Sequence, residues 1–491
     1  MRYSNFLFLF IILSLSVATV DAQDARGAAD PSGTTTIGTT LSVQQAVAIA
    51  IKNNLLVNQA DIQSQTNKVQ YDQSWGNMLP QISGQAQQQI GYGRTLNSYD
   101  YTYVNQVQTG NYSLQGNLTL FQGLTLQNNL KGNRYAYNAS KLDLQQQKDN
   151  ITLNVLSAYL LVLSSQDQLT VANEQADIDK KQVDRLVAVN QEGALLLLSN
   201  LSDLQGQYAG DQINIATAIN TLETAKVNLF QLLNVPYKRD VEYERSIANL
   251  SIADYQQPSD SIYRTAMGII PSIKSANLKA QAYQKFLSAS KGAYYPTLSF
   301  YGGIGTNYYN LASNVFNTTV TAGLPTGDYI AGPTGQVPVL YDKQNTRSEK
   351  ISWGSQFTDN KSSYIGLQLN VPILNYLRAR NNVKQARVNL KNAEINSNNT
   401  KLALQQSVEL AFQNMIASYK QYKFYIDQVA AYKESFRTTE IRFNEGVVNS
   451  DVYVLAKNNM DRATTNLAAA KYTYIFRTKV LDYYQGKLQI N

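Results

Sequence analysis

The side chains that most often perform chemistry in proteins are missing from this chain, because its 491 residues contain neither His nor Cys. Without imidazole, a Ser-His-Asp triad cannot form, and the commonest general base and transition-metal ligand are both absent. Without thiols, disulfides, thiolate metal sites and Cys nucleophiles are excluded. Carboxylate and Lys chemistry remains formally open. We therefore expect no catalytic, cofactor-binding or metal site, and a protein that is not an enzyme.

Two Glu-Gly pairs are the polar motif that recurs in the chain. Glu192-Gly193 and Glu445-Gly446 each lie between two long segments of helical periodicity, where a Gly can adopt the left-handed conformation that ends a helix. A single pair of this kind is an ordinary helix cap. Its recurrence at the same place in two hairpins predicts two equivalent hairpin tips.

Charged and apolar residues flank these tips. Glu440 and Arg442 could form an ion-paired latch that breaks when the helices near the second tip part; plain solvation of both side chains is the alternative. Beside the first tip, the leucines from Leu195 to Leu198 would form an exposed apolar patch unless a partner covers them.

An internal repeat positions both tips. A shift of 216 places Ala60 on Ala276 and Pro80 on Pro296, and a shift of 253 places Val155 on Val408. The difference, 253 − 216 = 37 residues, is an insertion between Tyr309 and Lys361. A duplicated unit of this kind predicts a pseudo-symmetric ring or tube.

Each repeat contains a helix followed by two segments of strand periodicity. The helices are expected from Ser42 to Leu79, ended by Pro80, and from Ser259 to Pro296. Apolar residues then alternate with uncharged polar ones in four segments, which are 81–92, 111–122, 297–309 and 362–374. Each is long enough for a tilted membrane strand, which needs about 9–11 residues, although a soluble sheet with one wet face reads the same way.

Four membrane strands could not close a barrel on their own, because about eight is the smallest number known. An open edge in hydrocarbon would leave backbone groups unpaired, at a cost of several kcal/mol each. The chain must therefore form oligomers if these strands cross a membrane. Three copies would give 3 × 4 = 12 strands.

Long helices fill the rest of both repeats. No proline interrupts 124–190 or 377–443, and at about 1.5 Å per residue each could extend roughly 100 Å. A coiled-coil seam is indicated in the second of these segments and in the helix that returns after its tip. The seam residues step by three and four: Ala379, Val383, Ala386, Leu390 and Ala393, then Ala456, Met460, Ala463, Leu467, Ala470 and Tyr474.

Composition and the first residues indicate export. Charged residues make up only 16% of the chain, and the net charge of +7 includes no basic run, so nucleic acid is not an expected partner. The apolar run from Phe6 to Val20 is short for a membrane span and predicts a signal peptide at 1–22, followed by an N-terminal extension at 23–41. A retained anchor is the alternative reading of that run.

The order helix, strand, strand, long hairpin, given twice, resembles the TolC-like outer-membrane efflux proteins, the exit ducts of tripartite pumps and type I secretion systems. Three segments carry the resemblance: residues 41–54 (LSVQQAVAIAIKNN), 294–298 (YYPTL) and 442–448 (RFNEGVV). It covers about Leu41 to Leu488. The resemblance divides the chain into a first repeat at 42–234, an equatorial linker at 235–257, a second repeat at 258–485 and a tail at 486–491.

The resemblance implies an α+β membrane protein of the Gram-negative outer membrane. Three chains would form a homotrimeric, 12-stranded transmembrane β-barrel in outer-membrane lipid, continued by a long α-helical coiled-coil tunnel through the periplasm. The loops at 93–110 and 310–361 would lie outside the cell. The channel would passively export substrates delivered by an inner-membrane transporter of the RND or ABC type and a periplasmic adaptor, also called a membrane fusion protein.

The resemblance also assigns adaptor contacts to the tips. They would fall on Glu192, Gly193, Leu195, Glu445, Gly446 and Val448. The first tip is more apolar than the family pattern, and the insertion at 310–361 is long for a loop. Cargo, transporter and adaptor identity, gating residues and lumen charge do not follow from the sequence. The alternatives are a secreted or surface coiled-coil adhesive protein and, less favoured, an outer-membrane barrel enzyme.

Overall fold

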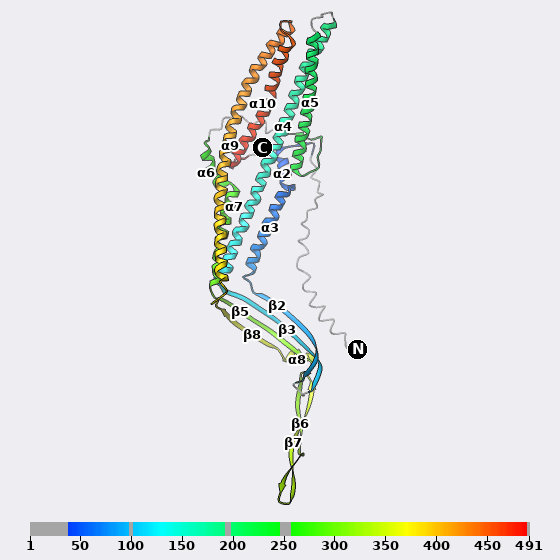
Figure 1. The fold of residues 1–491 in the computed structure, drawn as a ribbon, viewed down its shortest axis with the longest axis vertical. Helices are drawn as coiled ribbons and strands as arrows, with labels where there is room; N and C mark the ends of the chain where they lie inside the picture. The colour runs from blue at the N-terminus through cyan, green and yellow to red at the C-terminus, as the bar shows by residue number, and fades with distance from the viewer. Residues whose placement is uncertain (1–37, 98–101, 192–197, 246–256, 489–491) are drawn as a thin grey trace. The chain divides into compact units, whose positions relative to one another are not determined.

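The structure, a computed structural model, describes residues 38–97, 102–191, 198–245 and 257–488 (Figure 1). The expected signal peptide therefore lies outside the described residues, as does most of the N-terminal extension. The chain divides into two compact units. The helical unit comprises Met1–Gln63, Lys141–Lys274 and Asn399–Asn491, and the sheet unit comprises Ser64–Ser140 and Ser275–Asn398.

The two repeats have the same order of elements, which confirms the internal repeat. The first runs α2 (Val43–Asn53), α3 (Leu55–Gly76), β2 (Gln81–Leu96), β3 (Tyr103–Gln122), α4 (Thr125–Gln191) and α5 (Leu198–Leu233). The second runs α6 (Ser259–Ile269), α7 (Pro271–Lys291), η4 (Gly292–Tyr294), β5 (Thr297–Tyr309), β8 (Ser362–Asn370), α9 (Arg378–Asn444) and α10 (Ser450–Tyr484). The long helices α4 and α9 each contain 67 residues.

The expectation of one unbroken helix before each strand pair was wrong. The chain leaves the helical conformation at Asn54 (φ −68°, ψ 127°) and, in the second repeat, at Ile270 (φ −60°, ψ 125°). The Asn54 side chain accepts hydrogen bonds from the backbone N–H of Leu56 and Val57, so it caps α3. Pro271 occupies the first position of α7, where its missing N–H costs nothing. The helix is therefore interrupted at the equivalent place in both repeats, but by different residues.

Four strands form one antiparallel sheet in the order β2-β3-β5-β8 (Figure 1). β2 and β5 begin at the predicted residues. β2 extends to Leu96 and β3 begins at Tyr103, so most of the expected loop at 93–110 is strand. β8 ends at Asn370, four residues before its predicted end. Among the strands that the structure describes, β2 and β8 each have one edge without a partner strand.

The two faces of the sheet differ sharply in chemistry. The apolar face exposes large side chains, including Ile82, Ile304, Ile365, Leu367 and Leu369, and Ile365 is 82% exposed. The opposite face, which we call the wet face, contains mostly Gln, Asn, Ser, Thr, Gly and Tyr at its described, paired positions; the apolar exceptions are Val107, paired with Gly91, and Leu96, paired with Tyr103. The polar and glycine positions include Gln81, Ser83, Gln85, Gln87, Gln89, Thr109, Asn111, Ser113, Gln115, Asn117, Thr119, Ser299, Tyr301, Gly303, Gly305, Asn307, Tyr309, Ser362, Tyr364, Gly366 and Gln368.

The insertion between β5 and β8 is not a plain loop, contrary to expectation. It forms a long antiparallel hairpin of β6 (Ser313–Gly332) and β7 (Gly335–Lys350), followed by the short helix α8 (Trp353–Asp359). The Gln356 side chain holds α8 on the sheet. Its Oε1 accepts from the Tyr309 N–H at 2.9 Å, and its Nε2 donates to the Tyr309 carbonyl at 3.0 Å.

The helical unit has its largest core around Tyr159. The short strands β1 (Thr40–Leu41) and β4 (Glu242–Tyr243) pair in parallel, so the end of the N-terminal extension is joined to the equatorial linker. The buried Tyr159 hydroxyl donates to the Leu41 carbonyl at 2.8 Å and lies 2.9 Å from the Glu244 carbonyl. Among the described residues, no helix combines the length and apolar character that crossing a membrane requires.

Candidate functional site at the helix ends

The second hairpin tip adopts the geometry that its Glu-Gly pair predicts. α9 ends at Asn444, and Gly446 has a φ of +73°. The Gly446 N–H donates to the Phe443 carbonyl at 3.0 Å, and the Val447 N–H donates to the Arg442 carbonyl at 2.8 Å. This pair of bonds is a Schellman motif, which satisfies the last carbonyls of the helix and depends on a left-handed residue.

An aromatic core lies directly under this tip. Tyr453 on α10 is fully buried between Phe443 and Phe436 of α9, with ring centroids 4.8 Å and 5.4 Å away. Leu186 of α4 and Leu201 and Leu204 of α5 complete the buried cluster. Residues of all four long helices therefore pack together here, and the tip is fixed by both hairpins rather than by its own.

Polar contacts from α4 and α5 also hold the second tip. Gln182 Nε2 donates to Asn444 Oδ1 at 2.6 Å, and Arg185 donates to the Asn444 carbonyl at 2.8 Å. On the other side, Ser450 Oγ lies 2.9 Å from Asn200 Oδ1 and 2.6 Å from Asp203 Oδ2. Sequence reasoning missed these contacts, because residues about 250 positions apart carry no signal of contact in a single sequence.

The predicted tip residues differ in accessibility. Glu445 and Gly446 are exposed, whereas Val448 is half-buried and packs against the aromatic core. Val447, which was not predicted, is 65% exposed at the same tip. The predicted contacts Glu192, Gly193 and Leu195 of the first tip lie outside the described residues.

Glu440 and Arg442 form no ion pair with each other in the described structure. Side chains two positions apart on a helix point in different directions, so these two cannot meet within one chain. Arg442 is exposed, and Glu440 is half-buried beside a groove. A latch made of these residues remains a prediction that needs partners on other helices.

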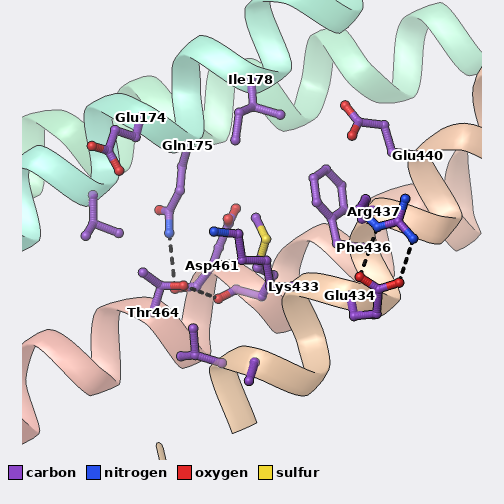
Figure 2. Close-up of a pocket in the computed structure, with 14 residues that line it drawn as sticks. Glu174, Gln175, Ile178, Lys433, Glu434, Phe436, Arg437, Glu440, Asp461 and Thr464 are labelled. Carbon is purple, nitrogen blue, oxygen red and sulfur yellow. Dashed lines mark hydrogen bonds and ion pairs between the residues drawn. The ribbon is translucent and has the colours of Figure 1, made fainter. Parts of the chain in front are cut away.

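The groove runs between α4, α9 and α10, with a volume of about 540 Å³ (Figure 2). Its wall from α9 carries Arg437 bonded to both carboxylate oxygens of Glu434, at 2.9 Å and 2.7 Å. Across the groove, Gln175 of α4 donates to the Asp461 carbonyl of α10 at 3.1 Å. The groove is open and carries charges of both signs along its rim.

A buried group of charges lies next to the groove. Lys457 of α10 is fully buried, with its Nζ 2.9 Å from Asp179 Oδ2, 3.1 Å from Asp211 Oδ2 and 2.6 Å from Asp461 Oδ2. We call these four residues the Lys457 cluster. Sequence reasoning missed it, because Lys457 and Asp461 have the i, i+4 spacing of an ordinary surface pair.

The chain matches the sequence pattern of the family described as outer membrane efflux protein, over residues 46–235 and 263–479. It is 23% identical to the outer membrane protein TolC of Salmonella enteritidis over 417 residues, which cover 82% of this chain and 74% of that protein.

Solved structures share the fold. The outer membrane protein VceC of Vibrio cholerae superposes with a TM-score of 0.70 at 11% identity, covering 91% of this chain and 97% of that one. The CmeC outer membrane channel of Campylobacter jejuni gives a TM-score of 0.67 at 16% identity, covering 91% of this chain and 86% of that one.

These matches confirm the expected resemblance, the α+β fold class with membrane strands and long tunnel helices, and the location in the Gram-negative outer membrane. The family consists of channels and is not a family of enzymes. The chain therefore belongs to the outer membrane efflux protein family and is an outer-membrane efflux channel.

Proposed function

We propose that three copies of this chain close a single 12-stranded barrel in the outer membrane and act as the exit duct of a tripartite efflux or type I secretion system. The duct is passive and catalyses no reaction. A periplasmic adaptor contacts its helix ends, and an inner-membrane transporter supplies the substrate and the energy.

The unpaired edges of β2 and β8 carry the trimer proposal. A four-stranded sheet with two open edges would leave N–H and C=O groups without partners in hydrocarbon, at several kcal/mol each. Pairing β2 of one copy with β8 of the next satisfies both edges. Three copies then give 3 × 4 = 12 strands, which is wide enough to leave a lumen.

The two faces of the sheet support the membrane placement. The apolar face exposes Ile365, Leu367 and Leu369, which suits contact with lipid tails. The wet face is polar and suits a water-filled lumen. A soluble sheet would cover its large apolar side chains with other protein. Among the described residues, α8 covers Tyr112 of this face, whereas Ile365, Leu367 and Leu369 stay exposed.

The helix ends support the adaptor proposal. Glu445, Gly446 and Val447 are exposed on a rigid support, because both hairpins hold the second tip in place. Val448 contributes less, since it is half-buried. The first-tip residues Glu192, Gly193 and Leu195 are proposed as equivalent contacts by the repeat.

The decisive experiment is reconstitution of the purified chain in planar lipid bilayers. The duct should give discrete conductance steps, and it should migrate as a heat-modifiable trimer from the outer-membrane fraction. A freely soluble monomer without conductance would refute the proposal. That result would favour the secreted coiled-coil alternative, which the four evenly built strands otherwise argue against.

A further inference from the structure

We propose that the Lys457 cluster is a proton-sensitive clamp that holds the α4–α5 hairpin to α10 below the second tip, tighter in mild acid than in mild base. The cluster joins three helices, with Asp179 on α4, Asp211 on α5, and Lys457 and Asp461 on α10. Parting the hairpins at this level would separate Lys457 from two of its three carboxylate partners.

The charges in the cluster do not balance. One ammonium faces three carboxylates, and the side chains of Lys457 and Asp179 are both fully buried. Three ionised carboxylates would leave two uncompensated negative charges away from water, which is very costly. Binding one proton removes half of that excess. Closely spaced carboxylates commonly share a proton for this reason.

Asp179 is the member that takes the proton. Lys457 Nζ donates to Asp461 and Asp211, but its contact with Asp179 lacks hydrogen-bond geometry. Neither Asp179 oxygen has a hydrogen-bond partner among the described residues. Burial raises the pKa of Asp179 to about 7, opposed by Lys457 and reinforced by Asp211. Burial also raises the pKa of Asp461.

The other groups that face the cluster do not replace this proton. Tyr453 lies beside the cluster, and its buried hydroxyl has no hydrogen-bond partner in the part of the chain that the structure describes; burial raises the pKa of Tyr453 far above neutral. For Lys457, burial alone would lower the pKa, but Asp461 and Asp179 outweigh that effect and raise it, so Lys457 stays charged. From α9, Glu440 adds negative charge. Lys433 and Arg437 line the groove with Asp461 (Figure 2).

The direction of the effect follows from linkage. Asp179 has a higher pKa in the packed state than in the parted state, where water restores a value near 3.8. Its contribution to packing is therefore complete below about pH 4 and is lost as the pH rises through about 7. Between pH 8 and pH 6, the equilibrium constant for parting should fall about tenfold.

Cysteine labelling tests the clamp directly, because the chain has no cysteine of its own. Ala176→Cys places a thiol at a buried site on α4, one turn from Asp179, and Asn173→Cys places one at an exposed site on the same helix. N-ethylmaleimide labelling of detergent-solubilised trimers gives the ratio of the two rates. The ratio cancels the pH dependence of thiol reactivity.

We expect this ratio to be about tenfold lower at pH 6 than at pH 8. Asp179→Asn, which mimics the protonated side chain, should abolish the change. The matched control Asp177→Asn removes an exposed carboxylate on α4 and should preserve it. An equal ratio at both pH values in the otherwise unchanged chain would overturn the clamp, as would a pH change that persists in Asp179→Asn.

A consequence for gating rests on the proposed function. If the duct opens by parting these helices, its open events in bilayers should be rarer at pH 6 than at pH 8, and Asp179→Asn should remove the difference. If the labelling ratio depends on pH but the frequency of channel opening does not, the gating step alone is refuted. Absence of any conductance would instead count against the proposed duct.

Discussion

Ser450 Oγ donates a hydrogen bond to Asp203 Oδ2 at 2.6 Å, which ties the first turn of α10 to α5. Ser450 is buried, and the Asp203 carboxylate lies where the helix dipole of α10 favours a negative charge. The second tip is thus anchored by a residue of the other hairpin.

Removing this contact should weaken the packing of the hairpins. In a double-mutant cycle, Ser450→Ala and Asp203→Ala should show a coupling energy of about 1.5–3 kcal/mol, as expected for a hydrogen bond to a charged group. Urea unfolding of the solubilised protein measures it. The pair Ser450→Ala and Asp451→Ala should be nearly additive, because Asp451 is exposed. Equal coupling in both cycles would contradict the role of Asp203.

Lys457→Met should destabilise the helical unit far more at pH 8 than at pH 5. Without the cation, the buried carboxylates can lower their cost only by binding protons, which they do more readily as the pH falls. At pH 8 the free energy of unfolding, measured by urea unfolding, should fall by about 3–5 kcal/mol. Lys181→Met is the control, because its 2.6 Å pair with Asp177 is exposed and should contribute at most about 1 kcal/mol. If the loss in free energy of unfolding caused by Lys457→Met did not vary with pH, the carboxylates around Lys457 would not be buried as described.

Gly446→Trp should abolish efflux while trimers still form. The left-handed φ of +73° disfavours any residue with a Cβ, and the indole would project into the open space around the tip. Drug susceptibility of cells and heat-modifiable migration of the trimer measure the two effects. Gly268→Trp is the control, since Gly268 is an exposed position on α6 with free space around it. Normal efflux in Gly446→Trp would remove the basis for an adaptor contact here.

The two faces of β8 should respond differently to a new charge. Ile365→Lys puts a cation on the face proposed to meet lipid and should cost about 2–4 kcal/mol or prevent trimer assembly. Gln368→Lys puts the same cation on the wet face, where trimers should assemble normally and the reversal potential in a KCl gradient should shift toward anion selectivity. The opposite pattern of assembly would mean that the faces are assigned the wrong way round.

The regular elements could be read from the sequence because local pattern dominates them. The absence of proline from 124–190 and 377–443 predicted α4 and α9 to within one residue at either end. Alternation likewise found all four strands of the main sheet. It predicted too late a start for β3, because residues near Tyr103 pair as strand without a clean alternation of apolar and polar residues.

Features that depend on tertiary contact could not be read in this way. The break at Asn54 resembles an ordinary polar position within a helical pattern, and only Pro271 offered a signal for its counterpart at Ile270. Asp179 follows the spacing of a solvated helix face, whereas in the fold it is fully buried. Which side chains of a helix become buried depends on contacts with residues far away in the sequence.

The paired strand positions of the wet face have a consequence for cargo, because none of those described carries a charged side chain. Arg94 is a charge beside this face, with its guanidinium over the Tyr103 ring. Away from that end, amides, hydroxyls and glycines give a wall that neither attracts cations nor repels anions. Transit along such a wall should be indifferent to the ionic strength of the medium. If this wall lines the proposed duct, any preference among exported compounds must be imposed before they reach the membrane, at the proposed helix-end contacts or by the proposed transporter.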